Sequence, residues 1–300
     1  MSGAITTERK RAVVYEATVV GLRMETADTA TLQLELAPEA GPVDYRAGQY
    51  LNIDPHQFPE LAALTAFLEE KKGRKEALRS YSMASAPHER YVAITVKDEP
   101  YVPGATLYPP LLSPLLVHGG LVGKTMRVTG FMGPYILPPD VDERTPHVLH
   151  VIAGSGMVPN FSLIKDALHR GLKVRHTLLA TNKTWADVLF REELHALERA
   201  HPDRLRIVHA LTREQDSSRF GGRVRQGRIT QELVEELLPA SAEHREQLLV
   251  YACGPAITPW DRRKALETRT TATPRFMETI ISHLHALGIG EKRIKRETYG

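Results

Sequence analysis

Short stretches of alternating apolar and polar residues dominate the first half of the chain. The alternation is clearest in Thr29–Leu36, and Val13–Val20, Tyr91–Val96 and Thr125–Gly130 are of similar length. Clusters of glycine and proline, which mark turns, separate these stretches. Several short strands divided by turns predict a closed antiparallel β-barrel.

One segment, between residues 58 and 78, interrupts this pattern. Leu61, Leu64, Phe67 and Leu68 recur there at helical spacing, and a charged run follows them. The spacing predicts a helix inserted into the barrel, and the charged run is typical of a solvent-exposed helix end. The residue pattern of this segment does not indicate a function for the inserted helix.

From His147 onward, apolar runs of strand length alternate with stretches of helical spacing. The predicted strands are 147–153, 173–180, 205–211 and 247–252, and the predicted helices are 161–170, 190–201 and 231–238. Strands that alternate with helices predict a doubly wound parallel α/β sheet.

The change of pattern predicts two domains. We expect an antiparallel β-barrel domain over residues 1–144, with the inserted helix at about 58–78, and a parallel α/β domain over residues 145–300. The segment 256–275 is longer and more polar than a simple connection, and the pattern assigns it no element.

Length and composition agree with two soluble domains. A chain of 300 residues is longer than a single core usually supports, and charged and apolar fractions of 25% and 42% are ordinary for globular proteins. The N-terminal residues lack the apolar core of a secretory signal, and no apolar run reaches the ~18 residues of a membrane helix. We therefore expect a cytoplasmic monomer without membrane contact.

Charge and cysteine content exclude several classes of function. The single cysteine, Cys253, excludes an internal disulfide and an iron–sulfur cluster held by cysteines of this chain alone, and we predict no metal site. The formal net charge of +3 is too small to favour nucleic acid as a partner, because nucleic-acid binding needs a strongly basic face. The charge is compatible with an acidic protein partner.

Three motifs follow one another along the chain, separated by roughly half a domain each. They are Arg79-Ser80-Tyr81-Ser82, Gly154-Ser155-Gly156-Met157-Val158-Pro159 and Cys253-Gly254-Pro255. In this order they resemble the flavin-binding, pyridine-nucleotide-binding and nicotinamide-side motifs of the ferredoxin–NADP reductase family. The resemblance implies an N-terminal FAD-binding barrel followed by an NADP-binding α/β domain.

The resemblance assigns roles in the flavin half. Arg79 would bind the FAD diphosphate through paired donors, Tyr81 would offer a flat surface to the isoalloxazine ring, and the Ser82 hydroxyl would lie at the ring edge. Tyr50 belongs to a stretch, 45–51, that resembles the family's barrel strand with Gly-Gln before an aromatic residue. The expected FAD-binding residues are Tyr50, Arg79, Ser80, Tyr81, Ser82, Val96 and Ser113.

Ser113 enters this set through the helix that it is expected to begin. Serine is favoured at the N-cap and proline at the first helical position, so Ser113-Pro114 predicts a helix start. The N-terminus of a helix favours phosphate, which predicts a second anion site here. A capped helix with a structural role alone explains the same residues.

In the second half, Gly154, Ser155, Gly156 and Pro159 lie between a predicted strand and a predicted helix. Glycines there let a dinucleotide diphosphate approach the backbone, and position 159 is proline as in the reductase family. After the strand 205–211, Thr212-Arg213-Glu214 is similar to the signature of NADPH-using members. Thr212, Arg213 and Arg223 would bind the 2′-phosphate, which favours NADPH over NADH.

Four residues are expected at the reacting centre. In the family, the cysteine of Cys253-Gly254-Pro255 borders the nicotinamide, and a C-terminal aromatic residue packs over the flavin with a glutamate two positions before it. Glu297 and Tyr299 match that spacing, although Gly300 follows the tyrosine here. The predicted catalytic group is Ser82, Cys253, Glu297 and Tyr299.

These assignments imply an enzyme of the ferredoxin–NADP(+) reductase type. It would pass hydride between NADPH and FAD and single electrons to or from a separate ferredoxin or flavodoxin. The alternatives are a reductase component of a multicomponent oxygenase and a non-catalytic flavin electron-transfer subunit. Two basic groups are candidates for docking an acidic acceptor, a C-terminal one of Lys292, Arg293, Lys295 and Arg296 and a second one of Lys71, Lys72, Arg74 and Lys75.

Overall fold

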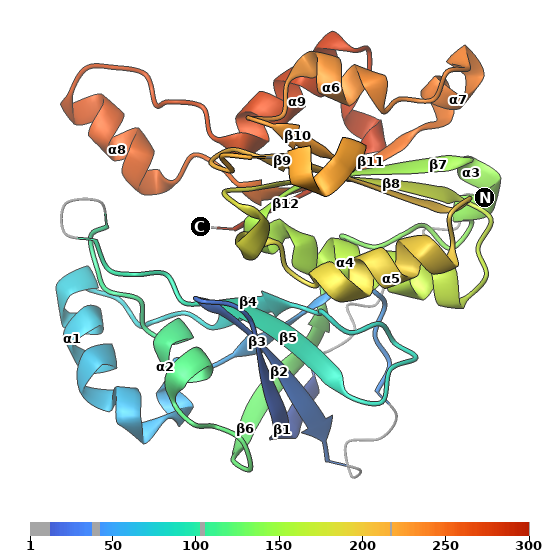
Figure 1. Ribbon diagram of the computed structural model, residues 1–300. Helices are drawn as coiled ribbons and strands as arrows, with labels where there is room; N and C mark the ends of the chain where they lie inside the picture. Colours follow the sequence, from blue (N-terminus) through green and yellow to red (C-terminus); the bar gives the residue numbers. More distant parts are fainter. Residues whose placement is uncertain (1–12, 38–42, 103–105, 217, 300) are drawn as a thin grey trace, which may run out of the picture.

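The computed structural model describes residues 13–37, 43–102, 106–216 and 218–299. It contains two six-stranded sheets, one from each half of the chain (Figure 1). The first half forms the antiparallel sheet and the second half forms the parallel sheet. The predicted two-domain fold is confirmed.

The antiparallel sheet has the strand order β4-β3-β6-β1-β2-β5. An isolated antiparallel bridge between Met83 and Ile94 joins its two outer strands and closes the barrel. The strands are β1 (Val13–Thr26), β2 (Thr29–Leu36), β3 (Tyr50–Ile53), β4 (Arg79–Ser82), β5 (Val92–Lys97) and β6 (Thr125–Met132).

Apolar side chains of these strands fill the barrel. Leu32, Leu51, Ile94 and Val128 have no exposed surface, as the alternation of apolar residues predicts for an inward face. β1 is longer than predicted, because two register shifts against β2 allow it to bend around the barrel.

Two α-helices accompany the barrel, α1 (Ala62–Lys72) and α2 (Ser113–His118). Helix α1 lies within the segment 58–78 and ends at Gly73, whose φ of 63° is left-handed. The predicted N-cap of α2 is wrong. Leu112 occupies that position, and Ser113 is the first helical residue and caps no backbone group.

The parallel sheet has the strand order β10-β9-β8-β7-β11-β12. Its strands are β7 (His147–Ala153), β8 (Arg175–Asn182), β9 (Leu205–Leu211), β10 (Val224–Gln226), β11 (Leu249–Pro255) and β12 (Ile294–Tyr299). The order reverses between β7 and β11, and ligands bind at the carboxyl ends of strands at such a point.

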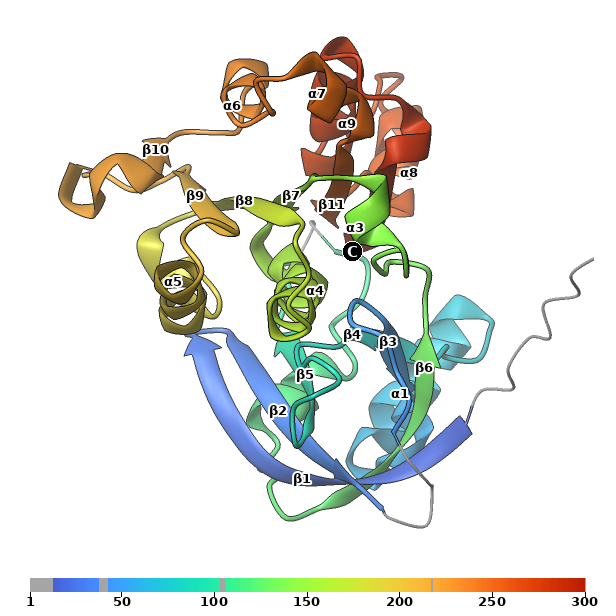
Figure 2. The same cartoon turned by 90° about the vertical axis from the view of Figure 1, so that its right-hand side faces the viewer.

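Helices cover both faces of the parallel sheet. Figure 2 shows α4 between this sheet and the barrel, with α6 and α9 on the opposite face. The helices of this half are α3 (Val141–Arg144), α4 (Met157–His169), α5 (Arg191–Ala200), α6 (Gln231–Glu236), α7 (Ala242–Gln247), α8 (Pro259–Glu267) and α9 (Phe276–Ala286). The sheet is therefore doubly wound, as predicted.

Several elements differ from the sequence-based expectation. Helix α4 begins at Met157 and not at Phe161, because the helix follows the glycine turn directly. The segment 256–275, which received no element, contains α8 with Thr258 as its N-cap. The C-terminal strand β12 was also not predicted.

The barrel and the α/β domain pack against each other along α4. The Ser162 hydroxyl donates to the carbonyl oxygen of Ser85 at 2.6 Å, and Lys165 Nζ lies 2.7 Å from both carboxylate oxygens of Glu89. Apolar residues of both halves share one core there. These contacts fix the position of the parallel sheet relative to the barrel.

Candidate active site

A cavity of about 500 Å³ lies between the barrel and the parallel sheet. Figure 1 shows the end of β12 facing the barrel at this place. The side chains that line the cavity are Tyr50, Ser80, Ser82, Pro134, Tyr135, Arg296, Glu297, Thr298 and Tyr299. Residues of β3 and β4 thus share one cavity with the last strand of the chain.

Three of the four predicted catalytic residues are joined by hydrogen bonds at this cavity. The Ser82 hydroxyl donates to Oε1 of Glu297 at 2.6 Å. The Tyr299 hydroxyl lies 2.7 Å from Oγ of Ser82 and 3.0 Å from Oε1 of Glu297. Ser82 ends β4 and the other two lie on β12, so only the fold brings them together.

The fourth residue, Cys253, adjoins this group from the sheet side. The pairing of β11 with β12 places Cys253 opposite Glu297 and Pro255 opposite Tyr299. Cys253 is completely buried, and burial raises the pKa of its thiol. The side chain is therefore a small neutral group at the carboxyl end of β11.

Burial also changes the acid–base properties of the hydrogen-bonded group. It raises the pKa of Glu297, although the hydrogen bonds from Ser82 and Tyr299 act in the opposite direction. It raises the pKa of Tyr299 further above its usual value, with the negative charge of Glu297 as a smaller cause. A carboxyl with a raised pKa takes up a proton at a higher pH than a free glutamic acid does, and here it lies beside two hydroxyls.

The glycine turn between β7 and α4 fits the approach of a diphosphate. Gly154 has a φ of +52°, and a Cβ added there would meet nothing within 4 Å, so its backbone faces open space. A Cβ on Gly156 would lie 2.1 Å from the carbonyl oxygen of Cys253, so glycine allows the turn to pack on β11. Ser155 lies in the same turn, and Pro159 is buried in the first turn of α4.

Gly254 serves packing between β11 and α9. A Cβ at this position would lie 2.5 Å from Cδ1 of Phe276. The Cys253-Gly254-Pro255 motif therefore ends β11, and Gly254 packs against the first residue of α9. Its predicted contact with the nucleotide stays a prediction.

Arg79 lies at the start of β4, at the opposite end of that strand from Ser82. Its Nη2 donates to Oε2 of Glu76 at 2.5 Å, and its Nη1 donates to the carbonyl oxygen of Ala77 at 2.7 Å. A guanidinium has five N–H donors. The two bonds described for Arg79 therefore leave further donors that could bind a ligand. Its predicted diphosphate contact stays a prediction.

The other predicted flavin-binding residues have different environments. Tyr81 packs against the barrel core, while Ser80 lines the cavity and donates to Oδ1 of Asn52 at 2.7 Å. Val96 is 1% exposed within the barrel core, so its side chain has no surface for a cofactor. Ser113 begins α2 outside the cavity lining.

The predicted 2′-phosphate residues separate in the structure. Thr212 and Arg213 are exposed beyond the end of β9, and the Arg213 N–H donates to the carbonyl oxygen of Lys183 at 2.8 Å. Arg223 instead donates through Nη1 to Oε2 of Glu198 at 2.8 Å. Thr212 and Arg213 lie at the carboxyl edge of the sheet, whereas Arg223 is paired with Glu198 of helix α5.

The sequence analysis missed Tyr135 as a cavity residue. Tyr135 is 2% exposed, and its hydroxyl donates to Oδ1 of Asn160 at 3.2 Å. Its ring meets Tyr251 edge-on at a centroid distance of 5.2 Å. The sequence Gly133-Pro134-Tyr135 directly after a strand is the only signal that marks it.

The cavity residues fit the ring system of a flavin. Tyr50 and Tyr299 provide aromatic surface, and Ser82 provides a hydroxyl for a polar ring edge. Arg79 lies three strand positions before Ser82, roughly 10 Å away at ~3.3 Å per residue. A ribityl chain of five carbons spans a comparable distance between the ring and the phosphate of a flavin nucleotide.

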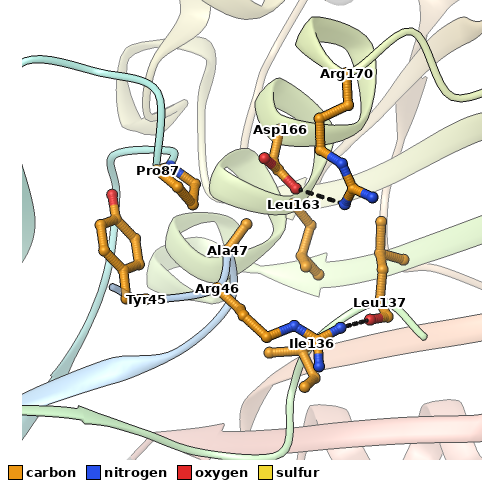
Figure 3. A pocket seen from close by; sticks show the side chains of 9 residues that line it. All are labelled: Tyr45, Arg46, Ala47, Pro87, Ile136, Leu137, Leu163, Asp166 and Arg170. Atoms are coloured by element: carbon orange, nitrogen blue, oxygen red, sulfur yellow. Dashed lines mark hydrogen bonds and ion pairs between the residues drawn. The ribbon is translucent and has the colours of Figure 1, made fainter. Parts of the chain in front are cut away.

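A second, smaller pocket of about 180 Å³ lies between the barrel and α4 (Figure 3). Its two arginines are both bound within the chain. Arg46 Nη2 donates to the carbonyl oxygen of Leu137 at 2.5 Å, and Arg170 pairs with Asp166 at 3.3 Å. The pocket contains none of the predicted catalytic residues.

Comparisons with known proteins agree with this arrangement. The family described as oxidoreductase NAD-binding domain matches residues 151–258. The chain is 33% identical over 214 residues to an NADPH oxidoreductase of Mycobacterium tuberculosis, covering 69% of this chain and 49% of that protein. It is 26% identical over 231 residues to a ferredoxin–NADP reductase of Picosynechococcus, covering 71% and 52%. Fungal NADH-cytochrome b5 reductases also match.

A solved structure gives the same result for the fold. The flavohem-like FAD/NAD-binding domain of nitric oxide dioxygenase from Vibrio cholerae superposes with a TM-score of 0.69 at 23% identity, covering 95% of this chain and 98% of that chain. Residues 151–258 match the oxidoreductase NAD-binding domain family, and the chain is similar in sequence to a ferredoxin–NADP reductase over 71% of its length. The resemblance that the three motifs indicate is confirmed.

Two further observations limit what these similarities imply. The chain spans about half the length of the curated relatives named above, so their activities and partners belong to those proteins. Among the described residues, no helix is both long and apolar enough to cross a membrane.

Proposed function

We propose that the chain binds FAD in the interdomain cavity and passes hydride between NADPH and FAD. The observation that carries this proposal is the hydrogen-bonded group of Ser82, Glu297 and Tyr299 at a cavity between two nucleotide-binding folds. FAD, when bound, supplies the ability to accept a hydride and release electrons singly. The protein contributes orientation, exclusion of water and the handling of a proton.

Each residue of the group has a part in this proposal. Ser82 presents its hydroxyl to the ring edge, and Glu297 holds that hydroxyl in place through Oε1. The Tyr299 hydroxyl lies within hydrogen-bond distance of the same two side chains and can donate its one proton to either, and Tyr299 lines the cavity, so it must move when a nicotinamide enters. The neutral Cys253 leaves a small space at the end of β11.

NADPH is the proposed nucleotide because of Thr212 and Arg213. Both are exposed at the carboxyl edge of the parallel sheet, where a hydroxyl and a guanidinium can bind a phosphate. Arg223 contributes only if its bond to Glu198 breaks, so Thr212 and Arg213 carry the proposal.

The Arg213→Ala variant should lose affinity for NADPH but keep its affinity for NADH. A charge-assisted hydrogen bond contributes about 1.5–3 kcal/mol, so the KM for NADPH should rise about 10-fold or more. Steady-state kinetics with both nucleotides measure this difference. Arg223→Ala is the matched control and should change both KM values little. An equal loss for both nucleotides in Arg213→Ala would assign the 2′-phosphate to other residues.

A separate ferredoxin or flavodoxin is the proposed electron partner. In the C-terminal basic group, Arg293 donates to the carbonyl oxygen of Gly288 and Arg296 pairs with Glu291 at 2.9 Å. Lys292 and Lys295 are the exposed cations of this group that remain beside the cavity strand, and we propose them as the docking surface.

The test of the proposed function is anaerobic reduction of the purified protein. FAD should copurify, its absorption should bleach on addition of NADPH, and oxidised ferredoxin or flavodoxin should restore it. Restoration only by the Rieske or ferredoxin component of an oxygenase would favour the oxygenase-reductase alternative. Bound FAD that NADPH does not reduce would instead indicate a non-catalytic electron-transfer subunit.

A further inference from the structure

Three charged side chains meet at the C-terminal end of helix α1. Glu76 accepts a hydrogen bond from Lys72 Nζ on Oε1 and another from Arg79 Nη2 on Oε2, each at 2.5 Å. Each of the two cations therefore donates to a different oxygen of the same carboxylate. Lys72 belongs to the inserted helix, and Arg79 begins β4.

The carboxylate lies beneath the two cations. The Glu76 side chain is 3% exposed, whereas the Lys72 and Arg79 side chains are 18% and 33% exposed. A buried carboxylate is stable only when it is paired, and here two cations pair with it. The outward surface of the cluster therefore consists of an ammonium and a guanidinium with donors left over.

The position of Glu76 is itself fixed by the inserted segment. The Glu76 N–H donates to Oε1 of Glu69 at 2.8 Å, and His56 Nε2 lies 2.8 Å from the same oxygen. His56 also contacts Asp54 at 2.6 Å through Nδ1. This chain of contacts ties the end of α1 to the barrel strand β3.

Lys72 and Arg79 present two cations against the single Glu76 carboxylate, while the neighbouring Glu69 and Asp54 carboxylates contact His56. Arg79 lies roughly 10 Å along β4 from Ser82, which lines the cavity, whereas Arg79 and Lys72 lie outside the cavity lining. Lys72 Nζ also lies 4.8 Å from the ring centroid of Tyr108, which restricts the ammonium on its other side. Both cations are thus held in place before any ligand arrives.

We propose that Lys72 is a second phosphate-binding residue and that Glu76 positions Lys72 and Arg79 together for the FAD diphosphate. The proposal rests on the proposed function, because the diphosphate belongs to FAD. It gives the inserted helix α1 a role in cofactor binding. A diphosphate carries a negative charge on each of two linked phosphates, so two adjacent cations match it better than one.

The test compares Lys72→Met with Lys71→Met in apoprotein titrated with FAD and with riboflavin. Lys71 is the matched control because it is adjacent on α1 and 52% exposed, and its described contacts are an ion pair with Glu70 and the ring of Phe67. Flavin fluorescence gives the dissociation constants. Lys72→Met should weaken FAD binding about 10-fold or more and leave riboflavin binding unchanged, since riboflavin has no phosphate. Lys71→Met should change neither.

Further variants keep the test decisive. Lys72→Arg retains the charge and should recover most of the FAD affinity, and Lys72→Gln replaces Lys72→Met if the latter does not fold. Unchanged FAD affinity, or equal losses for FAD and riboflavin, would overturn the proposal. A wild-type protein that binds no FAD would instead overturn the proposed function.

Discussion

The Glu297→Gln variant should reduce its bound FAD with NADPH about 10- to 100-fold more slowly than the wild-type protein. Glutamine keeps the shape of the side chain but removes the charge on the oxygen that accepts from Ser82 and Tyr299. Hydrogen bonds to charged groups contribute about 1.5–3 kcal/mol, which corresponds to this range of rates. Stopped-flow absorption under anaerobic conditions measures the flavin directly.

Ser82→Ala should show a similar decrease in the rate of FAD reduction, because this variant removes the donor of the Ser82–Glu297 hydrogen bond. The double variant should be little slower than either single variant, since both changes remove one interaction. FAD content should stay the same in all three. Lys295→Gln is the matched control on the same strand, and its reduction rate should equal that of the wild-type protein. Unchanged rates in Glu297→Gln and Ser82→Ala would remove this group from the reaction.

The pH dependence of the reduction rate gives an independent check on Glu297. Burial raises the pKa of this carboxyl above the usual 4.5, so it takes up a proton at a higher pH than a free glutamic acid does. Protonation removes the negative acceptor for Ser82, and the rate should fall as the pH decreases through the raised pKa. The Glu297→Gln variant should lack this decrease, because it has no group to titrate there.

Arg79→Ala should weaken FAD binding by about 2–4 kcal/mol, which is roughly 30-fold or more. The variant removes a guanidinium with paired donors for the diphosphate. It also leaves the buried Glu76 carboxylate with Lys72 as its sole cation among the contacts described, so the apoprotein should unfold at a lower temperature. Titration of apoprotein with FAD and thermal unfolding measure the two effects.

Two controls separate charge from geometry at this position. Arg79→Lys keeps the charge but loses the forked donor arrangement, so it should recover only part of the affinity. Arg74→Ala removes an exposed arginine from the same segment and should leave FAD binding unchanged. Full FAD content and unchanged stability in Arg79→Ala would show that the diphosphate lies elsewhere.

Much of the fold could be predicted from local patterns. Strand β2 matched its predicted limits, Thr29–Leu36, because one face of it fills the barrel and the alternation is complete. Helix α8 was missed although its signals are present. Thr258, Pro259 and Asp261 form an N-terminal capping box with proline at the first position. The polar composition of the segment concealed this signal.

The candidate site depended on contacts that no local pattern contains. The spacing of Glu297 and Tyr299 was visible, but their hydrogen bonds to Ser82 connect residues 215 and 217 positions apart. The pairing of Arg223, directly before β10, with Glu198 of α5 likewise joins residues 25 positions apart and has no sequence signal. Tyr135 was missed for the same reason, because its place in the cavity depends on both domains.

The most direct test of the central claim uses NADPH deuterated at C4 on one face or the other. Anaerobic stopped-flow reduction should be slower with one of the two deuterated forms and unchanged with the other, because a bound nicotinamide would present a single face to the flavin. Such a result would show hydride transfer from NADPH to the bound FAD at an ordered site. Reduction at the same rate with both forms, or no reduction of bound FAD, would contradict this account.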